Sequence, residues 1–339
     1  MRESHEVRMG LWHSYKLRLR RRRYLIRAFR KRRDLCSVVD RTAQIKQADI
    51  LLFATIRDEV DRLPVLLDHY RRMGVGHFIF VDNTSRDGSG AYLAAQPDVS
   101  LWSTQASYRR ARFGIDWMNH LLARYGHGHW CLTVDADEFL TYPHDDSRPL
   151  RALTDWLDAS RCRSMGAMLL DLYADDPTVH HVGPLHSDLL FDAGNYRISL
   201  NPEQKNLWIQ GGARDRLFFG DHPQDAPALN KIPLVKWHWR YVYTSSTHAL
   251  LPRGLNVVYS RTGVPRTCGL LLHTKMLHGF AARTFDALDH NEHFGMAREY
   301  RAYARGLRKD MRFRARPSRP MCDWRGFEAL NLMSRGDWV

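Results

Sequence analysis

Hydrophobic residues occur in short runs separated by amphipathic segments along the middle of the chain. Ile50 to Ile56 is an almost continuous apolar run, and Phe78 to Val81 is a second one. Between them, residues 60–70 carry apolar side chains at helical spacing, and glycines follow at positions 74 and 76. Runs of this length indicate buried strands, while spacings of three and four indicate a helix with one buried face. The pattern predicts a β-α-β unit.

The alternation continues toward the C-terminus. It predicts a short helix at 92–95, a strand at 99–102, a helix at 108–125 and a fourth strand within 130–140. A helix at 149–160 and a strand at 165–172 follow, and the aromatic residues of 237–243 alternate as in a strand. Strands that alternate with helices are typical of an α/β fold. We therefore expect a doubly wound, mostly parallel sheet flanked by helices, with a mixed second half.

The fourth predicted strand ends in three acidic residues within four positions: Asp135, Asp137 and Glu138. A buried strand cannot keep unpaired carboxylates, so these must reach solvent, a basic partner or a cation. Two carboxylates at positions i and i+2 can bind one hard cation such as Mg²⁺ or Mn²⁺. An ordinary acidic turn after a strand explains the same residues. We expect Glu138 to point to the other face and hold the loop.

Composition indicates an ordinary globular protein. The chain has 339 residues, of which 44% are hydrophobic, and its five cysteines show no paired spacing. A reduced, cytoplasmic setting fits such cysteines. No apolar run approaches the roughly 18 residues that span a bilayer, and no apolar segment typical of a secretory signal follows the N-terminal charges. We expect a cytoplasmic protein.

Charge is concentrated at the N-terminus, because residues 1–48 carry +11 of the formal net charge of +14. Residues 16–33 interleave arginines with leucine, isoleucine, tyrosine and phenylalanine. Such a segment can lie as a helix on the inner face of an anionic membrane. It can also bind nucleic acid through phosphates, which we rank last, or remain a flexible solvated tail.

Three motifs carry a resemblance to a known family. ATIRDE, then LLDHYRRMGVGHFIFVDNTSRDGS, then VDADEFL follow one another between residues 54 and 140. Their order resembles the family 2 glycosyltransferases, which have the GT-A fold and a D-x-D motif. A weaker likeness extends to about residue 280 through GGARDRLF, LNKIPLVKW and LLHTKML. The resemblance implies a transferase that uses a nucleotide diphosphate sugar and a divalent cation.

The resemblance also assigns roles to residues. It places the donor nucleotide near Thr55, Arg57 and Glu59, with its base or ribose near Asp82. It makes Asp135 and Asp137 the metal and diphosphate residues, with His273 as the third ligand of Mn²⁺ or Mg²⁺ and Lys275 facing the diphosphate. Apart from the resemblance, the charge of a departing diphosphate makes a basic residue at a helix start, such as Arg112, a further candidate for the donor, although surface solubility explains it equally well. One departure is Asp58, where relatives usually have asparagine. Residues 49–145 would then be the donor half of the domain and 146–280 the acceptor half, between the basic arm at 1–48 and a basic helical segment at 281–339.

The function expected from these residues is glycosyl transfer to a hydroxyl of a saccharide or lipid-linked acceptor, as in polysaccharide biosynthesis, with inversion. Asp215 or Asp171 is the expected base, although Asp215 lies between arginines that suit a structural ion pair. Metal-dependent phosphoryl transfer or phosphodiester hydrolysis is an alternative, but it requires a further acid for a second cation. A non-enzymatic module that binds membrane or nucleic acid through the basic arm is the other alternative.

Overall fold

A nine-stranded sheet forms the centre of the molecule. The computed structural model describes residues 10–176, 182–184, 188–259, 266–277, 280, 284, 297–307 and 312–338. The strand order is β1-β4-β3-β2-β5-β11-β7-β14-β6. In chain order the strands are β1 Cys36–Val39, β2 Ile50–Ile56, β3 Val75–Asp82, β4 Val99–Ser103, β5 Trp130–Thr133, β6 Glu138–Thr141, β7 Ser164–Asp171, β11 Asn230–Lys236 and β14 Gly269–His273.

Most strands of this sheet run in the same direction. β2 is parallel to both β3 and β5, β3 is parallel to β4, and β7 is parallel to β14. β11 lies antiparallel between β5 and β7, and β1 and β6 are antiparallel strands at the two edges. The predicted mostly parallel sheet with a mixed second half is confirmed. Six carboxyl ends therefore share one edge of the sheet.

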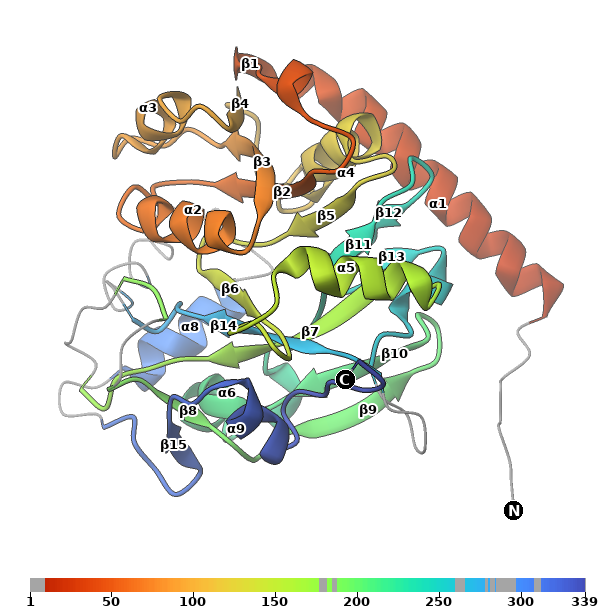
Figure 1. The fold of residues 1–339 in the computed structure, drawn as a ribbon. Helices are drawn as coiled ribbons and strands as arrows, with labels where there is room; N and C mark the ends of the chain where they lie inside the picture. The colour runs from red at the N-terminus through yellow and green to blue at the C-terminus, as the bar shows by residue number, and fades with distance from the viewer. Residues whose placement is uncertain are drawn as a thin grey trace.

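Helices cover both faces of the sheet (Figure 1). The connecting helices are α2 Leu63–Arg72, α3 Ser89–Ala94, α4 Ile115–Tyr125 and α5 Leu150–Ala159. The connections from β2 to β3 and from β4 to β5 lead in opposite directions along the sheet, so right-handed crossovers place α2 and α4 on opposite faces. The N-terminal helix, α1 Leu11–Lys31, packs outside α4.

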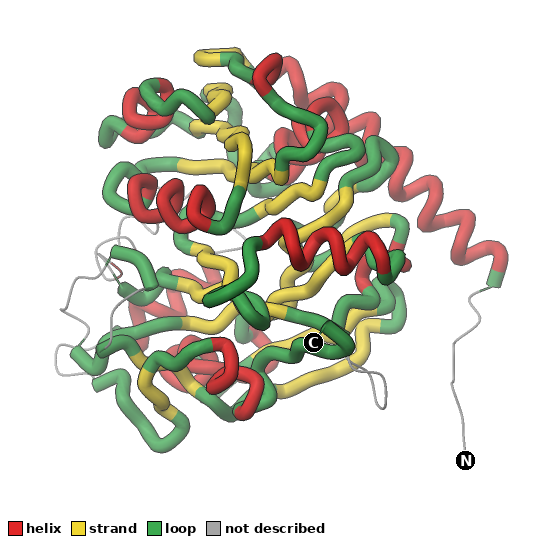
Figure 2. Tube along the Cα trace, in the orientation of Figure 1, coloured by secondary structure: helices red, strands yellow, loops and turns green. Residues whose placement is uncertain are grey.

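The second half adds small elements around the main sheet (Figure 2). Three two-stranded sheets pair β8 Leu190–Asp192 with β15 Ser318–Pro320, β9 Arg197–Asn201 with β10 Asn206–Gln210, and β12 Val242–Tyr243 with β13 Leu250–Leu251. In the described part of the chain, the remaining helices are α6 Gly212–Phe218, α8 Ala297–Gly306 and α9 Trp324–Ala329. Single 3-10 turns lie at Arg32–Asp34, Thr42–Gln44, Pro223–Asp225 and Arg253–Asn256. In the described residues, the larger of two hydrophobic clusters has members from Ile50 to Trp338, and the smaller one includes Tyr173, Tyr303 and Phe313. Most of residues 281–296, predicted to be helical, lie outside the described part of the chain.

Two predicted strands differ from the structure. The acidic stretch is not one strand: β5 ends at Thr133 and β6 begins at Glu138, with β11, β7 and β14 between them in the sheet. The apolar residues after the acids pair with β14 instead of extending β5. The aromatic stretch 237–243 is a strand only at Val242–Tyr243, because the amide of Tyr241 bonds back to His238 in a turn.

The helix predicted at 108–125 begins only at Ile115. Arg112, Phe113 and Gly114 have φ values of 55°, 58° and 75°, which are incompatible with a right-handed helix. The basic arm, in contrast, is helical from residue 11. None of the described helices has both the length and the apolar content needed to cross a bilayer.

Candidate functional site

The site lies where parallel strands end. Ile56 pairs with Asp82, and Asp82 with Ser103, so β2, β3 and β4 end side by side. β5 ends beside β2. The connections from β2 to β3 and from β3 to β4 lead one way along the sheet, and the connection from β4 to β5 leads the other way, so the chain reverses direction between β2 and β5. Ligands of open α/β sheets bind in the crevice at such a switch point. The acidic loop that follows β5 is therefore placed at the usual ligand-binding edge.

A cleft of about 590 Å³ opens beside these strand ends. It is lined by the segments that follow β2, β3 and β4: Arg57, Asn83, Thr84, Gln105, Ala106, Ser107, Tyr108, Arg109 and Arg110. Three of these residues are arginines and one is a tyrosine. Guanidinium groups bind phosphate in a bidentate way, and an aromatic ring can stack on a base. The cleft therefore has the chemistry for a nucleotide.

Of the residues predicted to bind the nucleotide, Arg57 lines this cleft, whereas Thr55, Glu59 and Asp82 are not among its lining residues. Asp82 Oδ1 accepts hydrogen bonds from the amide and hydroxyl of Ser85, which fixes the loop after β3. Glu59 binds Arg62 at 2.7 Å. Thr55 Oγ1 is buried and has no hydrogen-bond partner in the described structure. Asp58 accepts the amide of Arg86, so the unusual residue at this position joins two loops.

Asp137 and His273 come together, as the sequence predicted for two metal ligands. His273 Nε2 lies 3.4 Å from Asp137 Oδ2. His273 Nδ1 lies 2.7 Å from Asp171 Oδ1, and Arg214 Nε lies 2.8 Å from the other side of the same carboxylate. Strand register produces this arrangement, because His273 pairs with Asp171 on β7 and with Glu138 on β6. A continuous polar chain thus runs inward from the acidic loop.

Electrostatics keep both carboxylates of this chain ionised. Burial alone would raise the pKa of Asp137, but His273, Arg62 and Lys275 outweigh burial and hold its pKa well below the usual value. Burial likewise opposes ionisation of Asp171, but the charges of Arg214 and His273 lower its pKa to about 2. Both side chains are therefore available as anions at neutral pH.

Lys231 holds the acidic loop through two ion pairs. This residue was not selected in the sequence analysis. Its Nζ lies 2.7 Å from Glu138 Oε1 and 3.2 Å from Asp135 Oδ2. Glu138 also accepts the backbone amide of Asp135, so its predicted role in holding the loop is confirmed. Burial would lower the pKa of Lys231, but the two carboxylates raise it above the usual value. Asp135 remains half exposed and faces solvent.

Arg62 is a second residue that sequence reasoning missed. It is only 3% exposed, and its Nη1 binds Glu59. Its Nη2 is buried without a hydrogen-bond partner in the described structure, although Arg62 is close enough to lower the pKa of Asp137. A buried guanidinium N–H without a partner is costly. An anion bound beside Asp137 would satisfy it.

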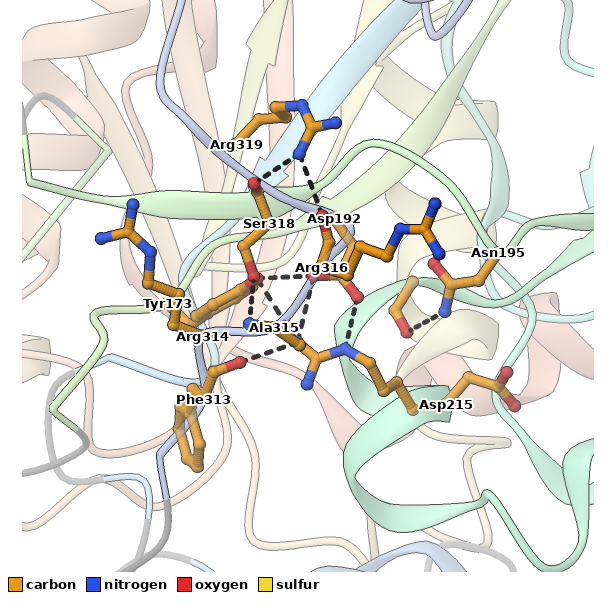
Figure 3. Close-up of polar contacts among 12 residues, drawn as sticks. Tyr173, Asp192, Asn195, Asp215, Phe313, Arg314, Ala315, Arg316, Ser318 and Arg319 are labelled. Atoms are coloured by element: carbon orange, nitrogen blue, oxygen red, sulfur yellow. Dashed lines mark hydrogen bonds and ion pairs between the residues drawn. The ribbon is translucent and has the colours of Figure 1, made fainter.

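Two predicted residues lie away from this cluster. Asp215 forms a bidentate ion pair with Arg197, at 2.7 and 3.0 Å. Figure 3 shows the carboxylate of Asp215 directed away from the hydrogen-bonded network around Asp192. Asp192 in turn accepts a hydrogen bond from Arg216. Arg112 binds the carbonyl oxygens of Tyr243 and Thr244 rather than facing the cleft.

The donor set fits an open site for Mn²⁺ or Mg²⁺ rather than a closed cage. In the described parts of the chain, no three His, Cys, Asp or Glu side chains converge tightly enough to enclose an ion. Asp137 and His273 do converge, and Asp171 binds the other nitrogen of His273, as carboxylates do behind metal-binding histidines. Carboxylates that leave room for water and phosphate suit these cations. Asp137 and His273 would hold the ion, and Asp135 lies beside them.

Comparisons with known proteins leave the chain without an assigned family. No protein-family model matches it, and no curated protein matches it. Among solved structures, it is similar to a protein from Bacillus anthracis assigned as a glucose-1-phosphate thymidylyltransferase, crystallised in complex with sucrose. The sequence identity is 11% and the TM-score is 0.32, over 78% of this chain and 98% of that one. Function is therefore inferred from this chain's own residues.

Proposed function

We propose that the protein is a metal-dependent glycosyltransferase that uses a nucleotide diphosphate sugar. Two observations carry the proposal: Asp137 and His273 meet at the end of β14, and an arginine-lined cleft lies at the ends of β2, β3 and β4. The cleft offers contacts for a nucleotide, and the acidic loop offers ligands for a cation at its diphosphate. The acceptor would be a hydroxyl of a saccharide or a lipid-linked molecule.

Each group has a task in this reaction. As the glycosidic bond breaks, negative charge develops on the departing diphosphate, and a bound divalent cation supplies Lewis-acid stabilisation there. Arg62 donates a hydrogen bond from its unsatisfied N–H to a phosphate oxygen, and this hydrogen bond strengthens as the negative charge grows. Asp171 keeps His273 in the orientation that presents Nε2 to the cation site. Its carboxylate is 4% exposed and already shared by His273 and Arg214, so we assign it a positioning role.

The direct test measures release of nucleoside diphosphate from a panel of nucleotide sugars in the presence of Mn²⁺. We expect release from at least one donor, loss on removal of the metal with EDTA, and a loss of about 100-fold or more in Asp137→Asn. Asp146→Asn is the matched control, because its carboxylate pairs with Arg325 at the surface. If no donor is turned over, or if Asp137→Asn equals the control, the proposal fails.

Arg62 provides a finer test with the same assay. Arg62→Gln removes the buried charge, and we expect kcat/KM for the donor to fall about 10- to 100-fold, the value of a charge-assisted hydrogen bond. Arg62→Lys keeps a charge, so its activity should lie between that of the wild type and that of Arg62→Gln. Release of nucleoside monophosphate and sugar 1-phosphate instead of nucleoside diphosphate would favour the alternative of phosphodiester hydrolysis.

A further inference from the structure

The N-terminal helix α1 is docked in a fixed rotation. Arg27 forms an ion pair with Asp116 of α4, whose side chain is fully buried. The guanidinium of Arg112 lies over the ring of Tyr24, 4.0 Å from its centroid. Ala28, on the same side of the helix, is 2% exposed. These contacts fix which face of α1 turns inward, and therefore which face turns away from the protein.

The outward face carries large apolar residues. At about 100° per residue, they fall in one sector of the helix roughly 100° wide: Trp12, Tyr15, Leu19, Ile26 and Phe29. Their exposed fractions lie between 44% and 67%. The polar face of a helix docked on a protein normally turns to water. A continuous apolar stripe on that side indicates a binding surface instead.

Basic residues interleave with this stripe. Lys16, Arg22, Arg23 and Arg30 are exposed and lie on the same side of the helix. The described residues of α1 contain no acidic side chain. The partner of this surface must therefore offer anionic groups together with an apolar layer directly beneath them. An anionic bilayer has this combination, because basic residues contact its headgroups while aromatic and aliphatic side chains enter the interface.

We propose that the outward face of α1 binds the surface of an anionic lipid bilayer, with the helix lying parallel to the membrane. Nucleic acid phosphates would satisfy the arginines but would leave Leu19, Ile26 and Phe29 in water. The geometry of α1 carries this proposal, which does not depend on the proposed enzymatic activity. It extends the sequence-based expectation by fixing which residues of the arm face the lipid.

The loop before β12 also carries an exposed aromatic residue beside an arginine. α1 contacts β12, and Arg21 of α1 is close enough to lower the pKa of His238, after the larger effect of burial. In the same loop, Trp239 is 47% exposed, and the guanidinium of Arg240 lies 4.6 Å from its ring centroid. Exposed tryptophan beside arginine is typical of membrane interfaces.

Vesicle co-sedimentation of the full chain tests the proposal. The vesicles consist of phosphatidylcholine, with or without phosphatidylglycerol. We expect binding to the vesicles that contain phosphatidylglycerol, weakening with salt. A triple variant, Trp12→Ser, Ile26→Ser and Phe29→Ser, should bind at least about tenfold more weakly, because each apolar side chain contributes through its buried area. These side chains are exposed, so the fold should be kept, which near-ultraviolet circular dichroism verifies.

The matched control replaces exposed apolar residues elsewhere. Ile198 and Leu200 on β9 are 63% and 45% exposed, and Ile198→Ser with Leu200→Ser should leave vesicle binding unchanged. The proposal is overturned if the chain does not bind anionic vesicles, or if the triple variant binds them as well as the control does. Binding of duplex DNA that the triple variant retains, with no vesicle binding, would assign α1 to nucleic acid instead.

Discussion

His273 owes its position to two carboxylates on opposite sides of its ring. Asp171 binds Nδ1 and directs Nε2 toward Asp137. Burial alone would lower the pKa of His273, but the two carboxylates raise it. Metal affinity should then depend on how Asp171 orients the ring.

Asp171→Asn tests this dependence. The asparagine keeps the size of the side chain but loses the charge behind His273, so we expect Mn²⁺ affinity to fall about 10- to 100-fold. Isothermal titration with Mn²⁺ measures the affinity directly. Because Arg214 would lose its partner, Asp171→Asn combined with Arg214→Gln controls for an unpaired buried charge. Asp215→Asn should leave Mn²⁺ affinity unchanged, and the opposite pattern would identify Asp215 as the residue at the cation.

Single residues differed in how far the sequence predicted them. Asp137 and His273 could be selected because an acidic strand end and a late histidine fit a known motif. Lys231 had a signal that could have been used: a lysine inside the apolar run LNKIPLV must be paired when buried. Arg62 had none, because an arginine at the start of an amphipathic helix usually faces water. Only the tertiary structure buries it beside Asp137.

At the level of elements, helix α2 completes the exposed edge of the sheet. β6 is an edge strand, and its outer backbone groups lack a neighbouring strand. Tyr70 donates to the carbonyl oxygen of Glu138 and accepts the amide of Leu140, while His69 Nε2 donates to the carbonyl oxygen of Leu140. Side chains of α2 thus replace a tenth strand and cover the edge. They also fix the strand on which the acidic loop ends.

This attachment predicts a loss of stability in acid. Burial lowers the pKa of His69 to about 4, whereas in the unfolded chain it is about 6.5. Between these values the unfolded chain binds more protons, so stability falls as the pH decreases from about 6.5 to 4. His69→Gln keeps a donor for Leu140 without titrating. Between pH 7 and 5, the unfolding free energy of this variant, measured with urea, should gain about 2 kcal/mol relative to that of the wild type. If the unfolding free energies of the two proteins change in parallel with pH, His69 does not have this role.

For the whole molecule, the C-terminal end closes over the loop that follows β6. Trp338 is 4% exposed and packs against Tyr142, His144 and Trp156. Trp338→Ala should therefore cost about 3–5 kcal/mol of unfolding free energy. Trp239→Ala, at an exposed site, should cost no more than about 0.5 kcal/mol. Urea unfolding of both variants provides the comparison, and equal stabilities would show that the C-terminal end is not part of the core.

The order of the four strands from β2 to β5 could be predicted, and the order of the others could not. Residues 50–133 alternate strand and helix locally, and right-handed crossovers then leave few arrangements. β11 enters antiparallel between β5 and β7, and β14 separates β7 from β6. These pairings join segments that are far apart in the chain, with no local pattern to indicate them. The same long-range pairing divided the acidic stretch into two strands.

The division of that stretch has a kinetic consequence. The carbonyl oxygen of Asp137 accepts the amide of Thr274, 137 positions later in the chain. β6 reaches the sheet only through β14 and β7, so the acidic loop takes its final shape after most of the chain has been synthesised. Contacts over such separations form slowly. Strands β2 to β5 can thus collapse early, while the proposed cation site is among the last parts to mature.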